Sequence, residues 1–252
     1  MEQLPVHPQR GREAPGYALD RRLSRLGSLP AEVREDAFHL TRQTVVFETL
    51  RLTGASVDKE VVDRLAAGRR ANGGRTEGDA LVLGQLEALE TVEARAKGER
   101  SVDLDLIREV HRRANPPSEG SFRSEDIKPQ FRNARPSPPR FVAARLSNLL
   151  DWLWAESGRA MFPAERMSLW FPRFLEIAPF EHGNFRTAHL LLSFFACAQG
   201  YPPVSLRLSE SEEIRAEIER ALNFDTYPLV QRFSEAISRS LSTLEETAEG
   251  RQ

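Results

Sequence analysis

A compact group of side chains that can do chemistry lies between residues 178 and 189. The stretch reads Ala-Pro-Phe-Glu-His-Gly-Asn-Phe-Arg-Thr-Ala-His, so it holds two histidines, a glutamate and an arginine. Histidine exchanges protons near neutral pH, and arginine binds anionic groups. Pro179, Gly183 and Asn184 predict a turn and then the start of a helix, where exposed backbone N–H groups favour anions. The pattern therefore indicates an anion site at a helix N-terminus.

Helices must position this group on both sides. One apolar run with helical spacing ends at Ile177, and another begins at Leu190, directly after the group. Similar periodicity predicts helices over residues 31–53, 57–67, 78–96, 102–114, 140–157, 163–177, 184–199, 209–222 and 227–244. Residues 118–139 carry several prolines and arginines, and they predict an irregular loop or a short β-hairpin. The predicted fold class is therefore all-α with at most one hairpin.

The chain divides into three parts. Residues 1–30 are rich in Pro, Gly and Arg and poorly periodic, which predicts a flexible N-terminal arm. Residues 31–245 form the predicted helical domain, with residues 31–53 as its first helix, and residues 246–252 form a tail. A hydrophobic content of 40% is enough for a core in a domain of this size.

Composition limits the partners and the compartment. Lys+Arg 35 against Asp+Glu 37 gives a net charge of -2, whereas nucleic-acid-binding proteins normally carry a strong basic excess. The sequence has no run of 18 apolar residues and no apolar signal-peptide region at its start, so no membrane association is expected. Its single cysteine, Cys197, excludes an internal disulfide and has apolar neighbours that predict a buried structural thiol. A cytoplasmic protein is the expectation.

The group at residues 178–189 resembles the signature of the Fic (Fido-fold) family, His-Pro-Phe-x-Asp/Glu-Gly-Asn-Gly-Arg-x-x-Arg. Residues 120–123, Gly-Ser-Phe-Arg, are similar to the family's Gly-x-Tyr/Phe-Arg sequence, and residues 106–111 are similar to a helix that ends in a family-typical histidine. The resemblance implies a Fic/Fido helical domain with one short β-hairpin flap, over residues 121–139. It also implies the family reaction, in which a histidine base and Mg²⁺ help to move AMP from ATP to a hydroxyl of a target protein.

Four chemically decisive positions depart from that signature. Ala178 stands at the position of the histidine base, and a methyl group accepts no proton. His182 replaces the acidic residue that would hold Mg²⁺, a cation that prefers carboxylate oxygen. Phe185 replaces the second glycine, and its ring is expected to crowd the anion pocket. His189 replaces the second arginine, which contacts the terminal phosphate in the family. The sequence therefore predicts no catalytic base at position 178 and no metal site.

The turn and one arginine keep the family's residues. Gly183, Asn184 and Arg186 are the candidates for binding an anion or a nucleotide, although Arg186 could instead pair with a carboxylate. Pro179 and Phe180 are expected to anchor the loop in the core.

A candidate inhibitory element lies near the N-terminus. Thr44 and Glu48 resemble the family's inhibitory pattern, Ser/Thr-x-x-x-Glu-Gly/Asn, and Thr49 departs from it at the last position. In the family the glutamate pairs with the second arginine, so Glu48 would pair here with a protonated His189. The alternative is an ordinary amphipathic helix whose Glu48 faces solvent.

Two functions are compatible with this pattern. The first is a Fic-fold pseudoenzyme without AMP-transferase activity, which acts through protein binding or regulation and holds a protein partner at the 121–139 flap. The second is a divergent Fic transferase that moves AMP or a related phosphate-containing group from a nucleotide to a protein hydroxyl. No cofactor is expected in the first case, and ATP with Mg²⁺ binds only if residual family function persists. The sequence leaves the oligomeric state open.

Overall fold

The structure is a computed structural model, and it describes residues 15–26, 29–68, 76–98, 101–155, 158 and 160–250. Its helices are α1 (Pro15–Leu26), α2 (Ala31–Leu52), α3 (Lys59–Ala66), α4 (Glu77–Lys97), α5 (Leu104–Ala114), α6 (Val142–Trp154), α8 (Pro163–Ile177), α9 (Asn184–Cys197), α10 (Ser211–Leu222) and α11 (Tyr227–Glu249). Short 3-10 turns cover Pro139–Phe141 and Leu208–Glu210. The predicted all-α class is confirmed. None of the helices described is long and apolar enough to cross a membrane.

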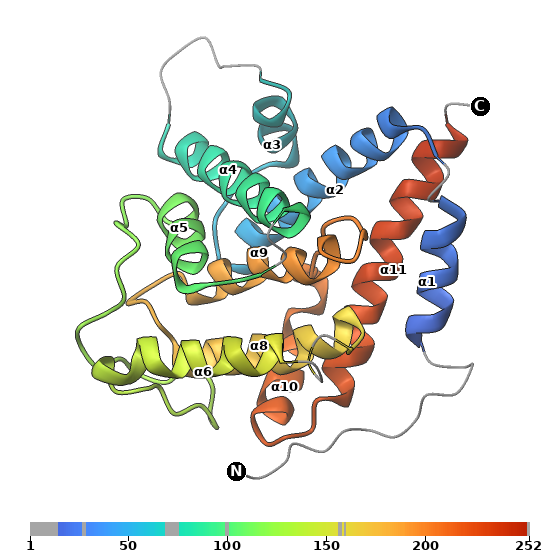
Figure 1. Cartoon of the computed structure of the whole chain (residues 1–252). Coiled ribbons are helices and arrows are strands. Elements are labelled where there is room, and N and C mark those ends of the chain that lie inside the picture. Colours follow the sequence, from blue (N-terminus) through green and yellow to red (C-terminus); the bar gives the residue numbers. More distant parts are fainter. Residues whose placement is uncertain are drawn as a thin grey trace.

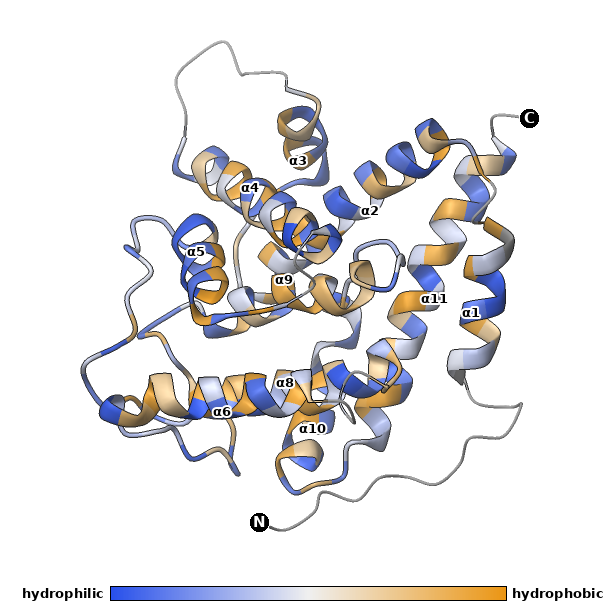
Figure 2. Cartoon of the chain, viewed as in Figure 1, coloured by the Kyte–Doolittle hydropathy of each residue, from blue (hydrophilic) through white to orange (hydrophobic). Residues whose placement is uncertain are grey.

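Helix α9 runs through the middle of the domain (Figure 1). It packs against α2, α4, α5 and α8. Every α9 residue is buried except Phe185 and Arg186, which belong to its first turn. Hydrophobic and hydrophilic residues alternate along the surrounding helices, as amphipathic packing around one core requires (Figure 2). The first turn of α9 is therefore the place where this central helix reaches beyond the core.

Helix α8 leads the chain into that turn. It begins at Pro163, whose fixed φ suits the first helical position, and it buries Trp170 and Phe174. The helix ends because Ala178 adopts a left-handed conformation, with φ 48° and ψ 67°. That conformation costs a residue other than glycine about 1–2 kcal/mol, so packing on both sides must impose it.

The prediction of a flexible arm over residues 1–30 is wrong for its described part. Residues Pro15–Leu26 form α1, which lies along α11 (Figure 1). Arg22 donates to Glu245 of α11 at 2.7 Å, and Leu19 is buried. These partners are more than 200 residues away in the sequence, which explains why local composition did not reveal the helix. Residues 1–14 lie outside the described residues. The predicted tail is also partly wrong, because α11 extends to Glu249.

The flap over residues 121–139 is irregular, so the predicted β-hairpin is wrong: the described residues contain no strand. Four prolines in this segment lack the N–H group that a strand ladder needs. The guanidinium of Arg123 takes the place of a ladder, since it donates to the carbonyl oxygens of Glu125, Ser137 and Ala178. One buried side chain thus ties both ends of the flap to the end of α8.

Candidate functional site

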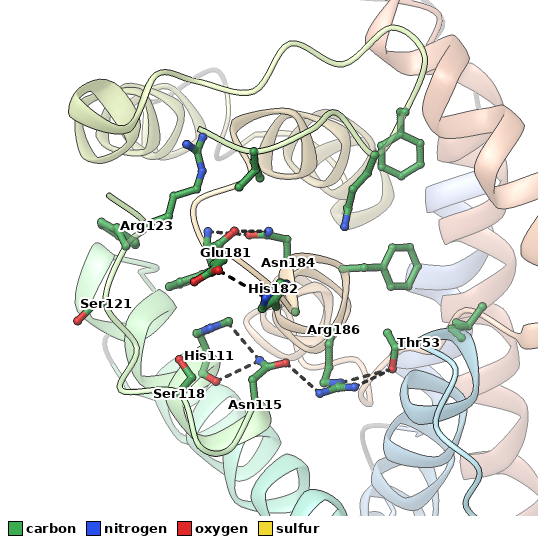
Figure 3. Close-up of a pocket in the computed structure, with 18 of the residues that line it drawn as sticks. Thr53, His111, Asn115, Ser118, Ser121, Arg123, Glu181, His182, Asn184 and Arg186 are labelled. Carbon is green, nitrogen blue, oxygen red and sulfur yellow. Dashed lines mark hydrogen bonds and ion pairs between the residues drawn. The ribbon is translucent and has the colours of Figure 1, made fainter. Parts of the chain in front are cut away.

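A cleft of about 1260 Å³ lies at the first turn of α9. The end of α2, the segment after α5, the loop 180–186 and the start of α10 line it. Figure 3 shows Thr53, Asn115 and Arg186 converging from three of these segments. The predicted group at 178–189 therefore does lie at a cleft, but its two end residues, Ala178 and His189, are not among the residues that line it.

Ala178 lies behind the cleft wall. Its exposed fraction is 2%, and its carbonyl oxygen accepts a hydrogen bond from Nε of Arg123 at 2.7 Å. The side chain is a methyl group, so the position offers no proton acceptor to a bound ligand.

Gly183 and Asn184 build the turn. Gly183 has a left-handed φ of 71°. The side chain of Asn184 closes the loop, because Oδ1 accepts from the backbone N–H of Phe180 at 2.9 Å and Nδ2 donates to its carbonyl oxygen at 2.7 Å. Both polar atoms of this amide are therefore engaged by Phe180. Asn184 therefore holds the loop in place.

Replacing Gly183 with alanine is expected to destabilise the protein more than backbone strain alone explains. A Cβ at this position would lie 2.1 Å from Oδ1 of Asn115. Gly54 is a matched control, since it has φ 83° and nothing within 4 Å of a Cβ. In urea denaturation, Gly183→Ala should lower the free energy of unfolding by about 1–3 kcal/mol more than Gly54→Ala, as overpacking does. Equal losses in the two variants would show that Asn115 moves aside without cost.

Arg186 brings to the cleft a positive charge that has no carboxylate partner among the described residues. Its guanidinium donates to Oδ1 of Asn115 at 3.0 Å, to Oγ1 of Thr53 at 3.2 Å and to the carbonyl oxygen of Ala114 at 3.4 Å. All three acceptors are neutral. Burial lowers the pKa of Arg186, and no described carboxylate opposes that shift. A partly buried charge that is satisfied only by neutral groups favours a bound anion.

Asn115 links α5 to this turn, although its residue type and position did not predict a role at the site. While Oδ1 accepts from Arg186, Nδ2 donates to Oγ1 of Thr187 at 3.2 Å and to the carbonyl oxygen of His111 at 3.1 Å. Its place after α5 and before Pro116 is a sequence signal for a helix end, which says nothing of a ligand site.

His111 is a structural residue at the floor of the cleft. Its ring lies flat on Phe180, with ring centroids 3.5 Å apart and planes 3° apart, and Nδ1 is 2.9 Å from Oγ1 of Thr187. Burial, aided by the charge of Arg186, lowers the pKa of His111 to about 4. The ring is therefore neutral at pH 7, and it supports the motif loop by stacking on Phe180.

The residues at the family's metal position do not fit Mg²⁺. His182 offers an imidazole, its side chain is 89% exposed, and its Nε2 lies 3.7 Å from Oε1 of Glu181. Mg²⁺ prefers several oxygen ligands in octahedral geometry. Within the described ranges, no three His, Cys, Asp or Glu side chains gather to hold a metal ion.

Phe185 forms part of the cleft wall. Its half-buried ring packs edge-on against Phe171, with centroids 5.6 Å apart. The ring therefore contacts the core on one side and the cleft on the other.

His189 is fully buried and forms no charge pair, so the predicted pair with Glu48 is wrong. Its Nε2 accepts from the backbone N–H of Leu206 at 2.9 Å, which places the ring proton on Nδ1, and Nδ1 donates to Oγ1 of Thr49 at 2.8 Å. Burial lowers the pKa of His189 to about 3. Glu48 instead accepts from the backbone N–H of Leu208 at 2.8 Å.

The predicted inhibitory residues do not reach the cleft. Thr44 is exposed, and neither Thr44 nor Glu48 lines it. The end of α2 reaches the cleft through Leu52, and Thr53, the next residue, lines the cleft as well. The same pattern recurs five residues further on, as Thr49-x-x-x-Thr53-Gly54, with a threonine where the pattern has glutamate. That spacing, and the glycine at its end, is the signal that would have found Thr53.

Comparisons with known proteins agree with this geometry. Residues 101–196 match the sequence profile of the Fic/DOC family. Protein adenylyltransferase fic-1 of Caenorhabditis briggsae is 33% identical over 140 residues, which cover 54% of this chain and 27% of that protein. Protein adenylyltransferase Fic of Nematostella vectensis is 28% identical over 165 residues, which cover 64% of this chain and 38% of that protein. The chain thus spans well under half the length of these relatives.

The fold is similar to that of a Fic domain containing signaling protein from Bacteroides thetaiotaomicron. The TM-score is 0.82 at 21% sequence identity, over 94% of this chain and 97% of that one. At that identity the likeness concerns the fold alone, and it includes the helices on both sides of residues 101–196. Profile, relatives and fold agree with the motif at the turn between α8 and α9. Residues 101–196 therefore match the Fic/DOC family, and they carry a degenerate motif in a helical Fic fold.

Proposed function

We propose that this protein is a Fic-fold pseudoenzyme, which transfers no AMP and acts by binding another protein. Ala178, at the position of the general base, is the observation that carries the proposal. Its methyl group has no lone pair, and its side chain is buried behind the cleft wall. Loss of a general base alone forfeits a factor of about 10²–10⁴ in rate. The exposed imidazole of His182 at the metal position supports the same conclusion.

The partner in this proposal binds at the 121–139 flap and the cleft beside it. Most flap residues are exposed or half-buried, and the four buried ones are Arg123, Phe131, Ala134 and Ser137. Because the described flap contains no strand, much of its backbone stays available to an extended segment of a partner. A cytoplasmic setting belongs to the proposal, since Cys197 is a free and buried thiol.

The cleft is expected to accept an anionic group, such as the phosphates of a nucleotide, without transferring it. The three hydrogen-bond acceptors of Arg186 are all neutral, so its charge remains available to an anion. The same residue stands in the first turn of α9, where backbone N–H groups also favour negative charge.

A divergent transferase is the second candidate function. It is favoured by the retention of Gly183 and Arg186 at an open cleft, together with the adenylyltransferase names of two relatives. Such an enzyme would move AMP or a related phosphate-containing group to a protein hydroxyl, with a proton acceptor other than residue 178.

Incubation of the purified protein with Mg²⁺, α-labelled ATP and a cell lysate separates the two functions. A pseudoenzyme labels no protein, and Ala178→His alone should restore no labelling, because the residues at 182 and 189 still differ from the family's. A Fic adenylyltransferase with an intact motif serves as the positive control. Labelling by the wild-type chain that disappears in His182→Ala would refute the pseudoenzyme and support the transferase.

A further inference from the structure

Thr53 places a hydroxyl group against the guanidinium of Arg186, whose described acceptors are all neutral. Its Oγ1 lies 3.2 Å from Nη2 and 3.4 Å from Nε, so one edge of the guanidinium faces this single oxygen. The hydroxyl also donates to the carbonyl oxygen of Thr49 at 2.9 Å, which closes the last turn of α2. Asn115 holds Nη1 of the same arginine at 3.0 Å. The guanidinium is therefore already oriented toward Thr53.

Thr53 also lies on an accessible segment. No residue from Arg51 to Asp58 is buried, and the chain from Thr53 to Asp58 is irregular until α3 begins at Lys59. Gly54, with φ 83°, has nothing within 4 Å of the position of a Cβ. An enzyme that modifies hydroxyl groups can thus reach this turn from solvent.

We propose that Thr53 is a phosphorylation site and that a phosphoryl group on it pairs with Arg186 and closes this end of the cleft. The donor is a nucleoside triphosphate bound to a protein kinase. A bond forms between Oγ1 of Thr53 and the γ-phosphorus, the bond from that phosphorus to the bridging oxygen breaks, and the nucleoside diphosphate leaves. The hydroxyl proton passes to the base of the kinase. The inference deepens the proposed function, since it rests on Arg186 as the anion-binding group of the cleft.

The charges around Thr53 favour this pairing. A phosphoryl group adds a charge of about −1.5 to −2 at pH 7 and three acceptor oxygens, where Thr53 now offers Arg186 one neutral hydroxyl oxygen. Paired hydrogen bonds from an arginine edge to a phosphate are stronger than bonds to a neutral oxygen. The C-terminal end of α2 opposes the phosphate through its partial negative charge, so the pairing depends on Arg186. A phosphate held there would exclude the phosphate of a ligand from the same guanidinium.

The test uses the full chain with phosphothreonine incorporated at position 53. A ³¹P NMR titration should give a second pKa for this phosphate below its ordinary value of about 6, and Arg186→Gln should return it toward that value. Phosphothreonine at position 44 is the matched control, because Thr44 lies in α2, the helix that Thr53 follows, and it is exposed and does not line the cleft. A titration at position 53 that is the same with and without Arg186 would overturn the proposal.

Two further measurements complete the test. Calorimetry with pyrophosphate should show binding to the unmodified chain at least tenfold tighter than to the chain phosphorylated at position 53. Equal affinities would mean that the phosphate does not close the cleft. No pyrophosphate binding to the unmodified chain would count against the anion cleft of the proposed function, whereas the NMR titration still tests the pairing. Phosphopeptide analysis of the wild-type chain after exposure to ATP and a lysate of its native cells should find position 53 modified, and its absence would rule out the site.

Discussion

Lowering the pH from 7 to 4 is expected to remove about 3 kcal/mol of the free energy of unfolding through His189, and about as much through His111. Both rings are buried and neutral in the folded protein. His189 receives a hydrogen bond from Leu206 on Nε2, so a proton added there would face a backbone N–H group. His111 is stacked on Phe180 beside the positive charge of Arg186.

The direction of the effect follows from the two states of each ring. The pKa is about 3 for His189 and about 4 for His111 in the folded protein, against about 6.5 for histidine in an unfolded chain. As the pH falls, the unfolded chain therefore takes up protons first. The contribution of the two rings is complete above pH 6.5 and is lost progressively down to pH 3 for His189 and pH 4 for His111. The loss is comparable with the entire stability of many domains, which is about 5–15 kcal/mol.

Urea unfolding at pH 7, 6, 5 and 4 measures this loss. In His189→Gln the side chain at 189 cannot titrate, so the fall in unfolding free energy near pH 5 should be smaller by about 1.4 kcal/mol per pH unit. His182→Gln is the matched control, because the His182 side chain is 89% exposed, and it should follow the wild-type curve. If His189→Gln also follows the wild-type curve, the ring of His189 is not buried in its neutral form.

Local signals predicted the helices that carry the motif. The range 163–177 agrees with α8, and the range 184–199 agrees with α9 to within two residues. Local chemistry sets the boundaries around the motif. Helix α8 begins with a proline and ends before the left-handed Ala178, and α9 begins directly after Gly183. Helix α1 was not predicted, because its stability comes from contacts with α11, near the other end of the chain, such as the one from Arg22 to Glu245.

The partners of the motif were harder to predict, because each lies far from it in sequence. Thr53 is 133 residues from Arg186, and Asn115 is 71 residues from it. The inhibitory pattern was placed at Glu48, five residues before Thr53. Five residues turn an α-helix by about 140° beyond a full turn, so Glu48 and Thr53, the residue that directly follows α2, point in different directions. The Thr53 side chain contacts Arg186, and the Glu48 side chain contacts the backbone of Leu208.

Arg123→Gln is expected to release the flap from the end of α8. Arg123 is buried, with an exposed fraction of 8%. Its guanidinium donates to the carbonyl oxygens of Glu125 and Ala178, both at 2.7 Å, and to that of Ser137. Each buried carbonyl left without a donor costs about 1–3 kcal/mol. The guanidinium also donates to the carbonyl oxygen of Ile177 at 3.3 Å, so four acceptors are affected. The free energy of unfolding should fall by at least about 3 kcal/mol, which is a large loss for one substitution.

Hydrogen exchange distinguishes a local release of the flap from a loss of stability in the whole domain. In Arg123→Gln, amides of residues 124–136 should exchange much faster, whereas amides of α9 should keep their protection relative to the global stability. Arg135→Gln is the matched control, because Arg135 is an exposed arginine of the same flap and should leave both regions unchanged. Arg123→Lys should resemble Arg123→Gln, since an ammonium group lacks the planar fork that reaches separate carbonyls.

The flap has a second anchor, in which the Glu219 carboxylate accepts from the backbone N–H groups of Arg132 and Asn133 at 2.5 and 3.1 Å. Unchanged exchange in Arg123→Gln would mean that other contacts, such as this second anchor, hold the flap, and that the Arg123 side chain does not control its position over the cleft.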